Sequence, residues 1–340
     1  MQEVVGHQQK AADQAQEAAQ EPSQQAQDGR WEEGQEEEEP NVRRKNLISE
    51  KKRQPDLREE AAESSLLDFL KSTAKTVTVD GEDFYVVEGD LILDEDQLEI
   101  YAINEERRRT EQVLGLAPGS LETGIANLGP EPMSGALVGI LSRGGKLVRW
   151  KEGLTLTYCV LRDTFSSQEK YELARGNMQK ATEDWQRICG VQFEHRAELD
   201  ESPGAQNPGV LFTVRAYDAG GQFIATTFFP TDPFNRRRVL LDESSYFAPD
   251  LRFDKVGVLR HALGHVLGFR HEHIRADTPA ACPDEPLFGT SRLTAYDPKS
   301  VMHYFCGGVG SAELALTDAD KLGAQKLYGP PLDQFFFVEE

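Results

Sequence analysis

Hydrophobic residues are distributed unevenly along the chain, and their pattern predicts regions of different kinds. Residues 1–60 carry few apolar positions and several blocks of like charge, which predicts a disordered, acidic and Gln-rich arm. Apolar residues then alternate from Thr76 to Val87 around Asp80-Gly81, which predicts a β-hairpin in a small folded unit. The Gly- and Pro-rich stretch at 116–132 predicts an exposed connector after that unit.

The strongest hydrophobic periodicity lies in the second half of the chain. Ser167 can cap a long amphipathic helix, whose apolar residues recur at spacings of four and three: Ala174, Met178, Ala181, Trp185 and Ile188. Strand-like segments are found on both sides of it, at 154–160, 191–195, 210–214, 222–229 and 239–241. A strand, a helix and then several strands predict an α+β fold with a helix packed on a twisted sheet.

Charge and length narrow the classes of function. The chain has 340 residues with 37 Lys and Arg against 58 Asp and Glu, which gives a net charge of −21. A field of this sign repels phosphate backbones and anionic lipid headgroups, so we expect neither a nucleic acid nor a membrane as partner. The apolar stretch Ala136–Leu141 is far shorter than the roughly 20 residues that a membrane-spanning helix needs.

The four cysteines lie in the C-terminal part of the chain, at positions 159, 189, 282 and 306. Nearest-neighbour pairing gives Cys159–Cys189 and Cys282–Cys306, each of which would stabilise the fold by about 3 kcal/mol. Two bridges predict an oxidising compartment and a secreted protein, whereas four buried thiols would fit a cytosolic one. Met1 is followed by Gln and Glu rather than a basic start and an apolar run, so we expect that no signal peptide is present in this chain.

Histidines gather in one stretch, because five of the seven fall between positions 261 and 303. His261 and His265 are four residues apart and therefore project from the same face of a helix. Gly268 can end that helix and turn the chain back, which lets His271 reach the same point. Three neutral imidazoles with an open fourth position are typical of a catalytic Zn²⁺ site, whereas the competing interpretation is a set of ordinary buried or surface histidines.

The stretch His-x-x-x-His-x-x-Gly-Phe-x-His-Glu, from His261 to Glu272, resembles the zinc-binding stretch of metzincin metallopeptidases, specifically of astacin-like enzymes. Ser300-Val-Met-His-Tyr resembles the Met-turn of that family. The resemblance implies that Met302 lies under the zinc and that Tyr304 is a fifth ligand that swings aside during catalysis. It covers about residues 147–330 and implies a metzincin-type domain with a mixed sheet and helices above the zinc cleft.

Two further segments resemble parts of the same family. The stretch from Gly220 to Pro230 resembles its upper-rim edge strand, and 317–329 resembles its closing helix. An extended peptide would then add to the edge strand through backbone hydrogen bonds. The substrate-binding residues implied on this strand are Phe223, Ile224, Ala225, Thr226 and Thr227.

One position departs from the family in a way that bears on activity. The family has Glu after the first ligand as the general base, whereas this chain has Ala262. A methyl group accepts no proton, so we expect bound zinc with little or no turnover. Ala262 fits a substitution that keeps a protease from cleaving itself, which we favour because the other site residues are in place, or a natural pseudoprotease.

Latency is implied by a second motif. Val87-Glu-Gly-Asp90 resembles the Phe-x-Gly-Asp motif of astacin-like proenzymes, with a departure at Val87, and implies that Asp90 occupies the zinc in the latent form. The competing interpretation is a plain turn between two strands. Glu272 corresponds to the glutamate that binds the mature N-terminus. In the uncut chain, a buried Glu272 would need Arg or water as its partner.

These observations predict three regions: an arm at 1–60, a propeptide with its connector at 61–146, and a catalytic domain at 147–340. The predicted function is that of a secreted zinc endopeptidase, present as a proenzyme and inactive as written. Its partners would be protein or peptide substrates and its own propeptide, acting as an intramolecular inhibitor. The alternative function is a zinc-binding pseudoprotease that serves as a non-catalytic peptide-binding module.

Overall fold

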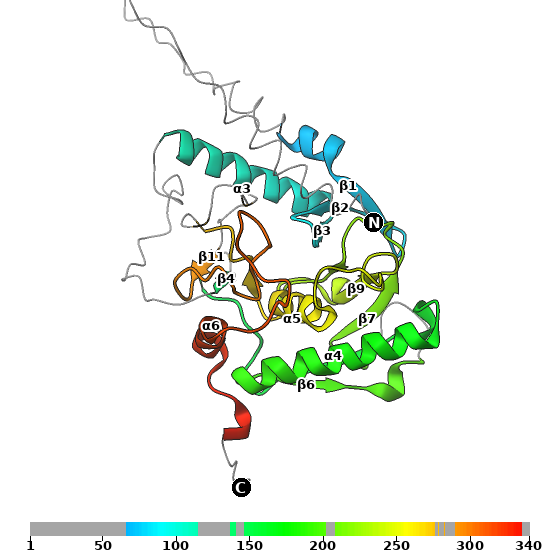
Figure 1. Cartoon of the computed structure of the whole chain (residues 1–340). Coiled ribbons are helices and arrows are strands. Elements are labelled where there is room, and N and C mark those ends of the chain that lie inside the picture. The colour runs from blue at the N-terminus through cyan, green and yellow to red at the C-terminus, as the bar shows by residue number, and fades with distance from the viewer. Residues whose placement is uncertain are drawn as a thin grey trace, which may run out of the picture.

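The structure is a computed structural model that describes residues 66–114, 137–140, 146–201, 208–275, 278, 282 and 290–334 (Figure 1). The predicted arm at 1–60 and the predicted connector at 116–132 lie outside these residues. No helix in the described part of the chain is both long enough and apolar enough to cross a bilayer.

The C-terminal part of the molecule contains a five-stranded sheet with the strand order β6-β5-β7-β9-β8. Its strands are β5 (Thr155–Val160), β6 (Gln192–His195), β7 (Phe212–Tyr217), β8 (Ala225–Thr226) and β9 (Arg238–Asp242). The first four strands in this order run parallel, and β8 pairs antiparallel with β9 at one edge. The fold is therefore α+β with a mixed sheet, as the sequence predicts.

Helix α4 (Gln168–Ile188) packs on one face of this sheet. Ser167 is its N-cap, since the Ser167 side chain accepts a hydrogen bond from the Lys170 amide at 3.3 Å. Ala174, Met178, Ala181 and Trp185 are buried in one core together with Leu156, Tyr158 and Val160 of β5, and the partly buried Ile188 packs against it. The predicted long amphipathic helix is thus confirmed.

Helix α5 (Lys255–Val266) lies between the sheet and the N-terminal unit, near the centre of Figure 1. The Asp254 side chain caps it by accepting from the Gly257 amide at 2.7 Å. Gly268 follows the helix with φ +94°, a left-handed conformation that turns the chain back into strand β10 (Phe269–Arg270).

The remaining elements of this part are short. Strand β4 (Val138–Ile140) pairs with β10 on one side and with β11 (Thr290–Arg292) on the other. Helix α6 (Asp318–Tyr328) begins with a capping box formed by Thr317 and Asp320. Single 3-10 turns occur at Arg162–Thr164, Ala197–Leu199, Phe234–Arg236 and Leu332–Gln334.

Residues 66–114 form a unit of their own that lies across the C-terminal part (Figure 1). The chain is helical at 66–73 and then forms a sheet of β1 (Lys75–Val79), β2 (Glu82–Val87) and β3 (Leu91–Leu93). The predicted hairpin is confirmed. The long helix α3 (Glu95–Val113) follows and was not predicted, although Asp94 and Gln97 form a reciprocal cap at its start.

The N-terminal unit contacts the sheet through apolar side chains and one charge cluster. Val77, Val79 and Phe84 pack in one cluster with Ala219, Phe223 and Leu240. At the hairpin turn, Asp80 accepts hydrogen bonds from Arg215 at 2.9 and 2.5 Å and lies 3.5 Å from Arg238. This unit, here called the hairpin unit (residues 66–114), therefore packs against β7, β9 and the loop before β8.

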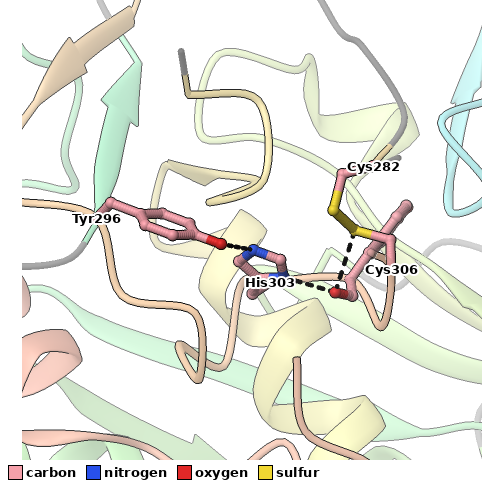
Figure 2. The surroundings of a disulfide bond; sticks show 5 residues. Cys282, Tyr296, His303 and Cys306 are labelled. Carbon is pink, nitrogen blue, oxygen red and sulfur yellow. Dashed lines mark hydrogen bonds between the residues drawn. A yellow bond between two sulfur atoms is a disulfide. The ribbon is translucent and has the colours of Figure 1, made fainter. Parts of the chain in front are cut away.

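The cysteines correct one prediction and confirm another. Cys282 and Cys306 are joined, as predicted (Figure 2). Cys159 and Cys189 are free and buried, so the predicted Cys159–Cys189 bridge is wrong. Neighbouring residues of a strand face opposite sides, so Cys159 packs with Leu161 in a separate cluster, whereas Cys189 ends α4 and lies in the main core.

Candidate metal centre

Two imidazoles of the centre come from α5 and are oriented by backbone carbonyls. His261 Nδ1 donates to the Val301 carbonyl and His265 Nδ1 donates to the Phe269 carbonyl, both at 2.8 Å. A carbonyl can only accept, so Nδ1 carries the proton and Nε2 presents a lone pair. This arrangement is typical of metal-binding histidines, whose second nitrogen is held by a hydrogen bond.

The three predicted histidines converge with Asp90 on one point. Asp90 Oδ2 lies 2.9 Å from His261 Nε2, 3.4 Å from His265 Nε2 and 3.2 Å from His271 Nε2. His265 Nε2 and His271 Nε2 are 3.2 Å apart, and one ligand atom from each of the four residues lies within 4.8 Å of the others. Zinc bonds of about 2.0–2.1 Å give a tetrahedron with edges of about 3.3 Å, so this donor set fits Zn²⁺.

The electrostatics of the centre favour the protonation states that metal binding requires. Burial lowers the pKa of His265 to about 4, so its imidazole is neutral at pH 7. Burial alone would raise the pKa of Asp90, but the charge on His271 and hydrogen bonds from all three histidines hold it well below its usual range. His265 is thus neutral and Asp90 ionised, which are the states in which an imidazole and a carboxylate bind a metal ion.

A tight turn delivers Asp90 to the centre. Residues 88–90 join β2 to β3, with Glu88 at φ +52° and Gly89 at φ +80°. The Tyr304 hydroxyl donates to Asp90 Oδ1 at 2.8 Å and also contacts the Glu88 carbonyl. The turn therefore places the Asp90 carboxylate among the histidines, and its role as a zinc ligand in a latent form stays a prediction.

The predicted Met-turn lies directly under α5. Met302 is fully buried, and its Sδ lies 2.2 Å from where a Cβ would stand on Gly264, between the two helical histidines. Asp320 of α6 holds the turn in place by accepting from Ser300 Oγ at 2.6 Å and from the Val301 amide at 2.9 Å. Tyr304 contacts the centre through Asp90, and its role as a fifth ligand stays a prediction.

Glu272 is buried directly after the third histidine. It accepts hydrogen bonds from Arg275 Nη1 at 2.9 Å and from the Asp297 amide at 3.0 Å. Burial raises the pKa of Glu272 to about 8, although Arg275 opposes the shift. The partner of this carboxylate in the structure is thus an arginine, one of the two partners that the sequence analysis allows.

Two residues near the disulfide brace the Met-turn and were not assigned from the sequence. His303 Nδ1 donates to the Tyr304 carbonyl at 2.5 Å, and the Tyr296 hydroxyl donates to His303 Nε2 at 2.8 Å (Figure 2). Burial lowers the pKa of His303, which favours the neutral ring that this pair of hydrogen bonds needs. His303 therefore holds the backbone of Tyr304 through a hydrogen bond and does not face the metal centre.

The predicted substrate strand is shorter than expected but lies at a sheet edge. Of residues 223–227, only Ala225 and Thr226 form a strand, and no strand in the described part of the chain pairs with the outer side of β8. A gap lined by Ile92 and Leu93 of the hairpin unit and by residues 226–229 follows this edge. The hairpin unit therefore borders the edge without adding a strand to its sheet.

An ion pair beside the centre was missed by the sequence analysis. Arg270 Nη2 donates to both carboxylate oxygens of Glu88, at 2.8 and 3.0 Å. The two residues are 182 positions apart, so no local pattern could have joined them. The available signal was only that each is adjacent or nearly adjacent to a predicted ligand.

Comparisons with known proteins give distant structural similarity. No family model matches the chain, and no curated protein matches it. The structure of myroilysin is similar at TM-score 0.39 and 15% identity, over 56% of this chain and 98% of that one. High choriolytic enzyme 1, a hatching enzyme zinc-protease from Oryzias latipes (medaka fish), is similar at TM-score 0.34 and 16% identity, over 54% and 94%. The chemistry of the centre is therefore inferred from its own four donor residues and not from these similarities.

Proposed function

We propose that this chain is the latent form of a secreted zinc-dependent endopeptidase. The observation that carries the proposal is the convergence of Asp90 Oδ2 with the Nε2 atoms of His261, His265 and His271 at 2.9–3.4 Å, close to the ~3.3 Å edge of a zinc tetrahedron. Three histidines are a catalytic donor set, and the fourth donor comes from a unit that can be removed by a cut in the connector. Zinc in such a site acts as a Lewis acid on water and on a peptide carbonyl.

The protein side chains divide the remaining work. His261 and His265 are held rigidly by their Nδ1 hydrogen bonds, so little reorganisation is needed when Asp90 leaves. The Tyr304 ring stacks on His273 and lies tilted against His271, with ring centroids 4.4 Å from each. Once Asp90 is removed, the Tyr304 hydroxyl loses this partner and can stabilise charge on a substrate oxygen at the centre.

The chain as written lacks the general base. Ala262 is buried on α5 beside His261 and offers only a methyl group. General-base help contributes typically about 10² to 10⁴ in rate, so we expect little or no turnover even with zinc bound. Restoring Glu at this position supplies the missing proton acceptor.

Substrate binding and latency involve the same face of the molecule. An extended peptide would add as a strand to the free edge of β8, with its carbonyl directed at the centre. The hairpin unit borders that edge and places Asp90 in the centre, which supports its role as an intramolecular inhibitor. The Cys282–Cys306 bridge supports an oxidising, extracellular location.

The experiment compares four full-length chains: the parent, Ala262→Glu, Ala262→Gln, and Ala262→Glu with His265→Gln. Each is loaded with zinc, cut with trypsin, whose nearest sites after 116–132 are Arg143 and Lys146, treated with a trypsin inhibitor and assayed on casein. We expect only Ala262→Glu to cleave casein, at about 10² times the parent rate or more, and a chelator to abolish it. Ala262→Gln has a similar size without a base and should stay inactive.

The second candidate function is a zinc-binding pseudoprotease that recognises peptides, and Ala262 is the observation that favours it. A pseudoprotease is expected to bind zinc and peptides without cleaving them. If the cut Ala262→Glu chain binds zinc and peptides but cleaves none, the endopeptidase proposal is wrong and the pseudoprotease is favoured.

A further inference from the structure

Glu88 is a buried charge directly beside the metal centre. Only 1% of its side chain is exposed, and its backbone is left-handed, a conformation that a non-glycine residue adopts only when its surroundings hold it there. The carboxylate lies on Arg270 Nη2 at 2.8 and 3.0 Å, and one of its oxygens is 3.5 Å from His271 Nδ1. A specific pocket therefore receives an acidic side chain two residues before Asp90.

That pocket belongs to the C-terminal part of the molecule. Arg270 ends β10, whose backbone is fixed by pairing with β4, and it immediately precedes His271. Its guanidinium carbon lies 5.9 Å from the ring centroid of Phe229, which in turn packs against His265 at 5.3 Å. The positive charge is thus held between the metal centre and the residues that follow the edge strand β8.

Removal of the hairpin unit takes the Glu88 carboxylate away from Arg270. The Arg270 side chain is only 13% exposed in the latent chain and would then face the emptied cleft. A guanidinium is the group best suited to bind a carboxylate. At hydrogen-bonding distance, the two charges attract each other more strongly in a partly buried cleft than in water.

We propose that Arg270 is a specificity-determining residue that binds a Glu or Asp side chain of the peptide substrate within two residues of the scissile bond. In the latent chain, Glu88 occupies this acidic subsite, as Asp90 occupies the metal centre. The inference rests on the proposed function, since it names the substrate class of the same site. The net charge of −21 does not oppose it, because charges beyond about 8 Å are largely screened at physiological salt.

The test uses the full-length Ala262→Glu chain, loaded with zinc, cut with trypsin and then treated with a trypsin inhibitor. A peptide series places Glu, Gln or Lys in turn at each of the two positions on either side of the scissile bond, and kcat/KM is measured for each peptide. We expect Glu to be preferred over Gln by about 10- to 100-fold at one position, as a charge-assisted hydrogen bond in a cleft predicts.

Variants assign the preference to Arg270. Arg270→Gln should remove it, and Arg270→Glu should shift it toward Lys, while Arg175→Gln on the surface of α4 should leave it unchanged. Binding to the cut parent chain gives an independent readout, with fluorescence anisotropy expected to show the Glu peptide bound about 10-fold more tightly than the Gln peptide. The peptide series is measured on the Ala262→Glu chain, which keeps Arg270. Its result therefore does not depend on whether the Arg270 variants fold.

The outcomes separate this inference from the proposed function. Cleavage of Glu and Gln peptides at equal rates at all four positions would overturn the acidic subsite and leave the endopeptidase standing, with Arg270 serving only to hold Glu88. A Glu preference that survives in Arg270→Gln would also overturn it. Cleavage of no peptide by the zinc-loaded Ala262→Glu chain would overturn the endopeptidase itself.

Discussion

Backbone carbonyls decide which nitrogen of each helical imidazole faces the centre. The Val301 and Phe269 carbonyls accept the Nδ1 protons of His261 and His265, which leaves both Nε2 atoms directed at Asp90. Because these contacts come from the Met-turn and from β10, the ligand geometry depends on chain segments that carry no ligand themselves.

The buried imidazole of His265 makes stability depend on pH. Its pKa is about 4 in the folded chain and about 6.5 when unfolded, so between these values the unfolded chain binds more protons. Stability is therefore fully present above pH 6.5 and is lost as the pH falls toward 4. We expect a loss of about 2 to 3 kcal/mol from this residue between pH 7 and 4.5, measured by urea unfolding of the metal-free chain.

The matched control for this measurement is His265→Gln, which keeps a polar side chain of similar size without the titration. Its unfolding free energy should fall less between the two pH values, by the amount assigned to His265. Equal pH slopes in the two chains would show that the burial of this imidazole has no such effect.

At the scale of elements, the position of α5 depends on close contact with the segment before α6. A Cβ on Gly257 would lie 2.4 Å from the Glu313 carbonyl oxygen and 2.8 Å from Leu314 Cβ. Only a glycine allows the helix to approach this backbone so closely, and the approach fixes the helix that carries two of the three histidines.

We expect Gly257→Ala to destabilise the fold by about 1 to 3 kcal/mol, because the helix or the facing backbone must shift to admit the methyl group. Gly176→Ala on α4 is the matched control, since a Cβ there meets nothing within 4 Å. That change should be neutral or stabilise by up to about 1 kcal/mol through helix propensity. Urea unfolding measures both, and a Gly257→Ala chain as stable as the parent would contradict the close packing.

Elements with a strong signal inside their own segment were predicted, whereas elements with a weak local signal were missed. The Ser167 cap and the apolar spacing of 174–188 predict α4, and Asp80-Gly81 predicts the hairpin, because each signal is complete within its own segment. Helix α3 was missed because its apolar residues are few and its start is marked only by Asp94 and Gln97. Strand β8 is short because pairing with β9 stops after Thr226, which the apolar run at 222–229 does not reveal.

The same division applies to the site. The spacing of His261, His265 and His271 is local and was sufficient to predict three donors at one point. The Glu88–Arg270 pair and the partners of Asp80 join segments that are more than 130 residues apart, so only the folded chain brings them together. The Cys159–Cys189 prediction was wrong for the opposite reason, because closeness in sequence was taken for closeness in space.

At the scale of the whole molecule, the hairpin unit is held by apolar packing and by several acidic side chains, among which Asp80 contacts two arginines. Asp80 lies between Arg215 and Arg238, which are both buried. Burial alone would raise the pKa of Asp80, but the hydrogen bonds and charges of the two arginines lower it. The charge cluster therefore stabilises the docked unit at neutral pH and is lost only as acid protonates the carboxyl group.

We expect Asp80→Asn to loosen the hairpin unit, because it leaves two buried guanidinium groups facing each other without a carboxylate. Hydrogen exchange at residues 75–87 should become about 10-fold faster or more, corresponding to the loss of a charge-assisted hydrogen bond. Glu99→Gln on the exposed face of α3 is the control and should change nothing. Unaltered exchange in Asp80→Asn would mean that the apolar cluster alone holds the unit.

The central claim is that three histidines and Asp90 bind one Zn²⁺ in the latent chain. X-ray absorption at the zinc edge of the purified, dialysed full-length protein tests it most directly. We predict one zinc per chain with three imidazole nitrogens and one carboxylate oxygen at about 2.0–2.1 Å. A correctly folded chain that retains no zinc, or a zinc shell without three imidazoles, would contradict the claim.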